Sequence, residues 1–239
     1  MKVLIYGATG MVGQGVLREC LRADDVELIR AVGRRETGLR HAKLRETLLP
    51  DLADSRAAES ELTGFHACFF CLGVSSVGMS EADYSRVTYD LTMAIGGTLA
   101  RLNPEMTFVY VSGAGTDSSE RGRSMWARVK GRTENALQRL GFRAVYLFRP
   151  GAIEPLEGIR SKTRLYHALY RLMKPVWPLL RVALGDRLVT TADVGQAMLA
   201  VARHDAATAV LEAPALHALA QAEAQSTKRR QNAVNDSAA

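Results

Sequence analysis

Short apolar runs alternate with longer amphipathic segments over most of the chain. The apolar runs, which predict strands, span residues 3–5, 26–32, 67–72, 106–111 and 144–148. A charged, poorly alternating stretch at 44–49 is the expected third strand. Apolar positions recur at helical spacing in 84–95, 126–140 and 193–203. Strands that alternate with helices form parallel sheets covered on both faces, so the pattern predicts an α/β fold built on a doubly wound parallel sheet.

Two of the expected helices have features that can be checked residue by residue. Tyr84, Val87, Leu91 and Ile95 are expected to share one buried helix face. The helix at 193–203 is expected to begin after a Thr-Thr-Ala-Asp sequence, because Thr and Asp side chains cap free backbone N–H groups.

Length and composition predict one domain. The chain has 239 residues, of which 47% are hydrophobic, enough for one well-buried α/β core. We assign residues 1–222 to a single domain that includes a small helical substrate-side lobe at 156–190. Residues 223–239 are polar and poor in aromatics, which predicts a disordered tail.

Signals of secretion and membrane insertion are absent from the sequence. No charged stretch followed by an apolar one opens it, and no apolar run reaches the roughly 18 residues that a spanning helix needs. Three cysteines, an odd number, fit a reducing compartment. We therefore expect a soluble, cytoplasmic protein without a transmembrane segment.

Three glycines between the first strand and the first helix carry the strongest chemical signal. Gly7 permits a tight turn, Gly10 lets a pyrophosphate approach the main chain, and Gly13 lets helix and strand pack closely. The free N–H groups at the helix start favour an anion. Segment 7–13 therefore predicts a dinucleotide site. The other residues expected to contact the dinucleotide in this segment are Thr9, Met11 and Val12.

The spacing G-x-x-G-x-x-G, with the sequence GATG at 7–10, resembles the extended and atypical short-chain dehydrogenases/reductases. The resemblance covers roughly residues 1–203 and is nearest the Tat-interacting, oxidoreductase-like group and its bacterial relatives, which are epimerase-like. It implies a Rossmann fold, NAD(P) binding, and oxidoreductase or epimerase activity on a carbonyl or alcohol substrate.

Two arginines after the second strand predict the choice of cofactor. An acidic residue at this place binds the ribose 2′-hydroxyl of NAD. Arg34 and Arg35 stand here instead, and their guanidiniums suit a 2′-phosphate. The prediction is NADP(H) in preference to NAD(H), and neighbouring Glu36 keeps NAD(H) open as an alternative. Another alternative is that both arginines are solvated loop residues in a chain of net charge +6.

The resemblance implies further cofactor contacts at the ends of the later strands. Relatives contact the adenine, the ribose and the nicotinamide end with residues that correspond here to Asp51, Leu52, Cys71, Leu72, Gly73, Val111, Lys130, Pro150, Gly151 and Ile153.

The catalytic positions depart from the family pattern of a Ser followed by Tyr-x-x-x-Lys. Ser112 fits the serine and Lys130 the lysine, but Trp126 stands four residues before Lys130, where the tyrosine is expected. An indole N–H can orient a carbonyl but cannot act as the acid or base. Two hypotheses follow: an oxidoreductase or epimerase with Ser112, Trp126 and Lys130 near its reaction centre, or an inactive NADP(H)-binding regulatory or assembly protein. Trp126 is also compatible with a plain packing role on an apolar helix face.

The remaining patterns predict less specific chemistry. Cys68 and Cys71 have C-x-x-C spacing but lie in an apolar strand, which favours buried structural thiols over a redox pair. The five histidines lack metal-ligand spacing, so no metal is expected. Basic residues are interspersed with acidic ones, which disfavours a specific nucleic-acid partner. The basic stretch at 156–190 suits an anionic small-molecule substrate or acidic lipid headgroups, or else consists of solvated arginines. The sequence leaves a homo-oligomer open.

Overall fold

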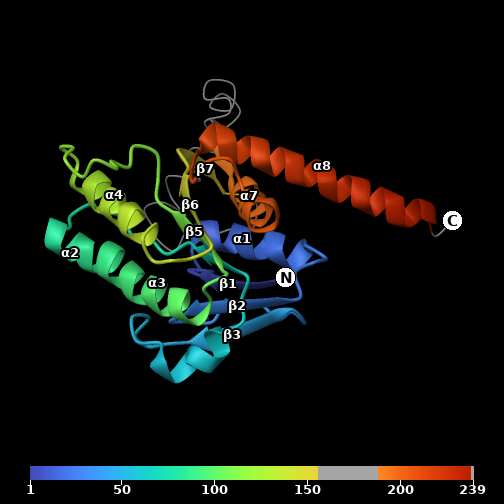
Figure 1. The fold of residues 1–239 in the computed structure, drawn as a ribbon, viewed down its shortest axis with the longest axis horizontal. Helices are drawn as coiled ribbons and strands as arrows, with labels where there is room; N and C mark the ends of the chain where they lie inside the picture. The colour runs from blue at the N-terminus through green and yellow to red at the C-terminus, as the bar shows by residue number, and fades with distance from the viewer. Residues whose placement is uncertain (156–187, 238–239) are drawn as a thin grey trace.

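A parallel sheet with helices on both faces forms the body of the protein (Figure 1). The computed structural model describes residues 1–155 and 188–237, with side chains as far as Ser226. Within these residues, seven strands pair in the order β3-β2-β1-β4-β5-β6-β9, each pair parallel. The strands are β1 (Lys2–Tyr6), β2 (Leu28–Gly33), β3 (Leu44–Leu48), β4 (Ala67–Phe70), β5 (Thr107–Val111), β6 (Ala144–Arg149) and β9 (Val210–Glu212). The α/β, doubly wound Rossmann-type fold expected from the sequence is confirmed.

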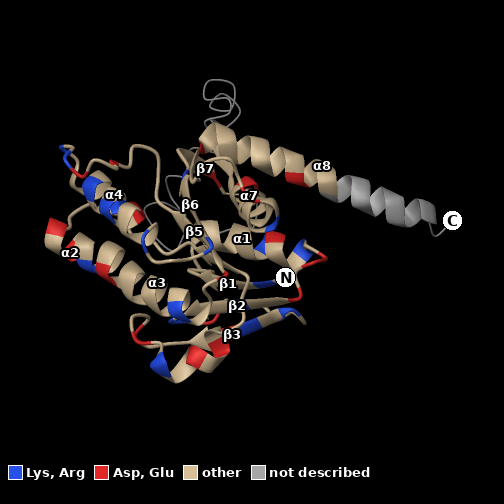
Figure 2. Ribbon diagram, viewed as in Figure 1, with Lys and Arg blue, Asp and Glu red and all other residues tan. Residues whose placement is uncertain are grey.

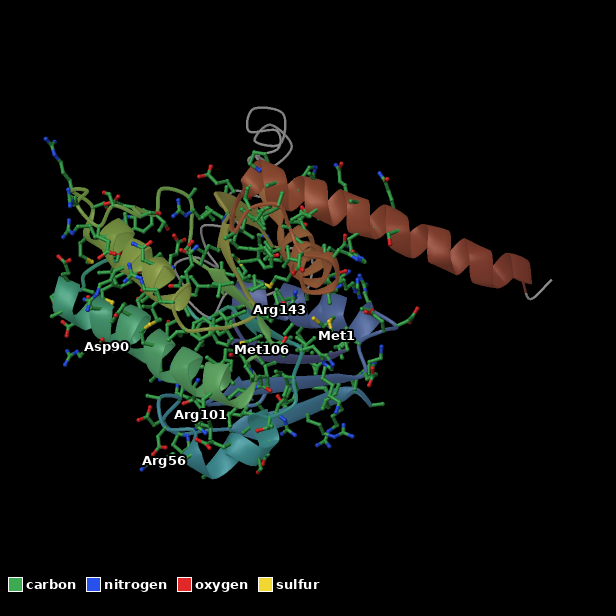
Figure 3. All side chains as sticks on the ribbon, viewed as in Figure 1. Met1, Arg56, Asp90, Arg101, Met106 and Arg143 are labelled. Carbon is green, nitrogen blue, oxygen red and sulfur yellow. The ribbon has the colours of Figure 1, made fainter. Side chains whose placement is uncertain are left out.

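The helices form two layers. One layer contains α1 (Met11–Arg22), α7 (Thr191–His204) and α8 (Ala213–Ser237), and α8 projects well beyond the body in Figure 1. The other contains α2 (Glu81–Ser85), the π-helical turn η2 (Arg86–Asp90), α3 (Leu91–Leu102) and α4 (Met125–Leu137). The 3₁₀ segment η1 (Arg56–Leu62) lies near the end of α3, where Arg101 pairs with Glu59 (Figure 3).

Each face of the sheet has its own hydrophobic core. Val3 and Ile5 of β1 pack with α1 and α7, whereas Leu4 and Tyr6 face the layer of α3 and α4. Because both faces are covered, the central strands are apolar at nearly every position rather than alternating. The weak pattern at 44–49 belongs to β3, which lies at the edge of the sheet. The third strand was therefore predicted in the correct place.

Helices α1 and α7 approach closely through glycines. A Cβ on Gly15 would lie 2.5 Å from the Cβ of Thr191, and one on Gly195 would lie 2.9 Å from Cγ of Glu19. The expected start of α7 is confirmed, because Thr190 and Asp193 form a reciprocal capping box. The α1 and α7 backbones therefore pack as one rigid layer behind the first strand.

The helix face expected over 84–95 is wrong at one position. Tyr84 and Ile95 are buried, but Val87 is 42% exposed and Thr88 is buried in its place. The cause is η2, where the N–H of Leu91 bonds to the carbonyl of Arg86 instead of the residue four back. The extra residue in this turn shifts the positions that face the core, so they no longer follow the 3.6-residue period of an α-helix.

The structure also differs from the expected disordered tail. Helix α8 continues to Ser237, and Glu223 near its middle is buried against Arg203 of α7. The buried positions of α8 recur at helical spacing at Ala213, Leu216, Ala220 and Glu223, so the buried face of the helix reaches the first residue of the expected tail.

Most of the substrate-side lobe expected at 156–190 lies outside the described residues. Its described edges are β7 (Ala152–Glu154) and β8 (Leu188–Thr190), which pair in parallel as a separate two-stranded sheet. Within the described part of the chain, no helix is both long and apolar enough to cross a membrane. Basic and acidic residues are interspersed along α1 and α4 in Figure 2.

Candidate functional site

A cleft of about 540 Å³ opens at the carboxyl ends of β1, β2 and β4. The strand order reverses between β1 and β4, and this reversal is where open parallel sheets form a crevice for ligands. The cleft is lined by Gly7, Ala8, Thr9, Gly10, Met11, Ala31, Val32, Gly33, Arg34, Arg35, Thr37, Glu46, Leu52, Cys71, Leu72 and Gly73. Its floor is therefore the glycine-rich turn, and one side is the segment after β2.

The glycine-rich turn has no room for side chains at its two ends. Gly7 has φ +82°, and a Cβ there would lie 2.8 Å from the carbonyl carbon and oxygen of Cys71. A Cβ on Gly13 would lie 2.1 Å from the carbonyl oxygen of Gly7. The two glycines therefore bring the turn against the end of β4 and the first turn of α1 against β1.

The N-terminus of α1 faces the cleft without a side-chain cap. Gly10 is the N-cap residue, no side chain bonds to the first backbone N–H groups, and the first turn contains no acidic residue. Gly10 and Met11 both line the cleft. Free N–H groups and the helix dipole at this point favour a phosphate or another anion.

The segment after β2 brings both positive and negative charge to the other end of the cleft. Arg34 and Arg35 are exposed, and neither forms an ion pair or hydrogen bond with another described residue. Glu46 of β3 lines the same end and accepts a hydrogen bond from the N–H of Thr37 at 2.6 Å. Sequence reasoning missed Glu46, because only the register that pairs it with Ala31 of β2 brings it to the cleft.

The structure brings most of the sequence-predicted cofactor residues together, but not all. Those that line the cleft are Gly7, Thr9, Gly10, Met11, Arg34, Arg35, Leu52, Cys71, Leu72 and Gly73. Val12 and Ile153 pack against the core, and Gly13 packs under the turn. Exposed Asp51 accepts a hydrogen bond from Ala53 and lies beside a separate surface depression.

A second group of polar residues lies at the carboxyl end of β5, the strand next to β4. Ser112 follows β5, and its hydroxyl donates to the carbonyl of Phe148 at 3.1 Å. Lys130 of α4 donates to the carbonyl of Val111 at 3.5 Å, and its Nζ lies 5.5 Å from the ring centroid of Tyr110. The carbonyl of Pro150, before Gly151, accepts a hydrogen bond from the N–H of Ala114 at 2.9 Å. Ser112 directly follows Val111, whose carbonyl accepts the hydrogen bond from Lys130. The two predicted residues therefore lie together at the end of β5.

Lys130 is electrostatically unusual. It is 9% exposed, and burial lowers its pKa from 10.5 to about 8, with Glu134 partly opposing the shift. Glu134 is itself buried and is held by Arg149, whose Nε donates to its carboxylate at 3.1 Å. Because Arg149 engages Glu134, Lys130 has no carboxylate partner of its own at hydrogen-bond distance among the described residues.

Among the described residues, the tyrosine whose ring lies over Lys130 is Tyr110, which is buried and so does not substitute for the one missing from the expected motif. Trp126 is half-buried one helical turn before Lys130, and its indole lies 3.6 Å from the position of a Cβ on Gly115. Tyr84 and Tyr110 are buried, which raises the pKa of each phenol. Among the described residues at the end of β5, Lys130 is therefore the group whose pKa is shifted toward neutral pH, whereas burial shifts the pKa of Tyr110 away from it.

The three cysteines are free thiols. Cys68 and Cys20 are buried, and Cys71 is partly buried at the cleft. Burial raises the pKa of Cys71 to about 12 and that of Cys68 well above its ordinary value, so neither is a ready thiolate. This agrees with the interpretation of Cys68 and Cys71 as structural thiols. Among the described residues, no group of three or more His, Cys, Asp or Glu side chains could hold a metal.

Comparisons with known proteins relate this chain to two sets of proteins. No profile of a known protein family matches it. The chain is 27% identical over 199 residues to a protein named fmp52, mitochondrial, of Emericella nidulans, which covers 80% of this chain and 82% of the relative. It is 30% identical over 155 residues to FMP52, mitochondrial, of Eremothecium gossypii, which covers 64% of this chain and 66% of the relative.

Solved structures share the fold at low sequence identity. The Bordetella bronchiseptica enzyme WbmF in complex with NAD⁺ superposes with a TM-score of 0.65 at 14% identity, over 94% of this chain and 77% of WbmF. An oxidoreductase of the short-chain dehydrogenase/reductase family from Burkholderia thailandensis superposes with a TM-score of 0.63 at 17% identity, over 88% of this chain and 89% of that protein. These neighbours share the Rossmann fold of short-chain dehydrogenases/reductases.

Two sequence-based expectations change with these comparisons. The relatives are named FMP52, so the narrower resemblance to the Tat-interacting group is not confirmed. The cytoplasmic location is contradicted, because five relatives are all named as mitochondrial. Cysteine number and the lack of an apolar run constrain redox state and membrane spanning, but they do not specify a compartment.

Proposed function

We propose that this chain binds NADP(H) in the cleft at β1, β2 and β4 and acts as an oxidoreductase or epimerase of the short-chain dehydrogenase/reductase type. The observation that carries the proposal is the cleft itself, which has a helix N-terminus without a side-chain cap at one end and, at the other, two arginines that have no partner among the described residues. The likeness in fold to WbmF, a structure that contains NAD⁺, supports a nicotinamide dinucleotide as the ligand.

The residues of the cleft fit the parts of such a dinucleotide. Met11 and the next residues of the first turn of α1 would hold the pyrophosphate through their backbone N–H groups, whereas the N–H of Gly10 already donates to the carbonyl of Gly7 at 2.9 Å. Arg34 and Arg35 would bind a ribose 2′-phosphate, which guanidiniums recognise with paired hydrogen bonds. Leu72 and Gly73 line the side next to β4, where the ligand would turn toward β5.

The reaction centre in this proposal is the end of β5. When bound, the nicotinamide supplies hydride transfer. Ser112 would orient a substrate oxygen through its hydroxyl, and Trp126 would add an N–H donor that cannot titrate. Lys130 would hold or release the proton at Nζ, because a pKa of about 8 lets both of its forms exist near neutral pH.

Direct binding measurements test the cofactor. We expect NADPH to bind more tightly than NADH, measured by cofactor fluorescence and thermal stability. The double variant Arg34→Ala with Arg35→Ala should weaken NADPH at least tenfold and leave NADH nearly unchanged. A matched control, Arg121→Ala with Arg139→Ala, removes the same charge from exposed positions outside the cleft and should change neither affinity. Absence of binding to both cofactors would refute the proposed function.

A second candidate is an NADP(H)-binding protein without turnover, whose occupancy regulates a partner. Trp126 favours it, because the tyrosine that relatives use as acid or base is missing. The variant Trp126→Tyr tests the choice in a screen of carbonyl substrates with NADPH. Activity in the wild type supports the enzyme, whereas activity that appears only in Trp126→Tyr supports an otherwise assembled but silent site.

A further inference from the structure

The cofactor cleft contains an acidic side chain that the glycine and arginine patterns do not explain. Glu46 is the carboxylate among the described residues that line it, and it comes from the edge strand β3. Its partner in the β2–β3 register is Ala31, so both side chains lie on the sheet face that α1 covers. Glu46 is thereby held on the same side of the cleft as the segment that carries the two arginines.

Glu46 makes a specific contact with that segment. One carboxylate oxygen accepts the backbone N–H of Thr37 at 2.6 Å, and the Thr37 hydroxyl in turn accepts the N–H of Leu39 at 3.2 Å. Arg34 and Arg35 lie between the end of β2 and Thr37 and have no described partners of their own. The bond from Thr37 to Glu46 therefore ties the end of the arginine segment to the sheet.

The charge of Glu46 acts against the ligand that the arginines attract. A 2′-phosphate bound by Arg34 and Arg35 would share the cleft with the Glu46 carboxylate, and like charges repel. A ribose with a free 2′-hydroxyl has no such conflict, since the hydroxyl can donate to a carboxylate.

We propose that Glu46 is a positioning and specificity residue: it anchors the arginine segment through Thr37 and keeps the site open to NAD(H) by opposing a 2′-phosphate. This inference rests on the proposed binding of NADP(H). In this proposal the Glu46 carboxylate has two roles. It accepts the hydrogen bond from Thr37, which an amide oxygen could also do, and it carries a negative charge, which an amide does not.

Two variants separate these functions. Glu46→Gln keeps an acceptor for Thr37 and removes the charge, so the affinity for NADPH should rise about five- to tenfold at low salt, with less change for NADH. The gain should shrink as salt screens the repulsion. Glu46→Ala removes the anchor as well, so exchange of the Thr37 amide hydrogen should accelerate in this variant and stay near the wild-type rate in Glu46→Gln. Glu105→Gln, at an exposed position just before β5 and therefore at the amino ends of the strands, away from the cleft, is the control for net charge and should alter neither affinity.

The outcomes are distinguishable. If the wild type binds neither cofactor, the proposed function fails. If it binds NADPH but Glu46→Gln leaves the ratio of NADPH to NADH affinity unchanged, the specificity role of Glu46 is overturned. An unchanged rate of Thr37 amide exchange in Glu46→Ala would overturn the positioning role.

Discussion

Replacing Gly13 by alanine is expected to destabilise the protein, although alanine is the better helix former. A Cβ at this position would lie 2.1 Å from the carbonyl oxygen of Gly7 and 2.9 Å from Cα of Ala8. Ordinary contacts between carbon and a carbonyl oxygen are about 3.3–3.6 Å. The first turn of α1 would therefore have to withdraw by about 1 Å, because the atoms it meets belong to the backbone and cannot rotate away.

The magnitude follows from two opposing terms. Overpacking of this kind costs about 3 kcal/mol, the upper end of the usual range, since no flexible side chain can yield. Replacing a helical glycine by alanine returns about 1 kcal/mol. The net expectation is a loss of about 2 kcal/mol, or a decrease of about 4–8 °C in melting temperature for a chain of this size. NADPH affinity should fall at least tenfold, because the phosphate-binding turn moves with the helix.

Gly97 of α3 is the matched control, because a Cβ there would meet nothing within 4 Å. Gly97→Ala should gain about 1 kcal/mol from helix propensity and leave cofactor binding unchanged. Urea unfolding and NADPH titration of both variants measure the two effects. If Gly13→Ala proves as stable as Gly97→Ala, the steric argument for the glycine-rich turn is refuted.

Two further predictions concern the buried charges of α4. Since burial lowers the pKa of Lys130 from 10.5 to about 8, the unfolded chain binds the extra proton between these values, and stability should rise as pH increases from 8 to 10.5. Lys130→Met should remove this slope and be more stable than the wild type at pH 7 by on the order of 3 kcal/mol, with the difference closing by pH 10.5; equal pH profiles in urea unfolding would contradict the shift. Glu134→Gln leaves Arg149 buried without its counter-charge and should lose about 3 kcal/mol in the same assay, whereas a loss below about 1 kcal/mol would show that Arg149 finds water or another partner.

Local patterns predicted the parts of the fold that depend on local physics. The glycine-rich turn, the strands before and after it, and the capping box at Thr190 were readable because each depends on residues near one another in sequence. The buried position of Thr88 in place of Val87 was not, because a π-helical turn breaks the period on which the prediction rested. The burial of Glu223, the first residue of the expected tail, was missed because it depends on an ion pair with Arg203 of α7, far away in sequence.

The same distinction applies to the candidate site. Arg34 and Arg35 could be expected at the cleft because they follow the second strand directly. Glu46 reaches it through pairing between strands, and its charged, weakly alternating neighbourhood made β3 the least certain strand. A simple signal could have found it: an acidic residue on an otherwise inward-facing position of the strand that flanks the arginine segment.

The small sheet of β7 and β8 lies between the main sheet and helix α7 along the chain. Ala152 pairs with Leu188 and Glu154 with Thr190 in parallel, so β7 ends beside Thr190 and β8 begins beside Ala152. Thr190 then caps α7, which packs directly against the helix of the glycine-rich turn. The pairing of β7 with β8 therefore couples the chain that follows β6 of the main sheet to the helix layer behind the nucleotide cleft.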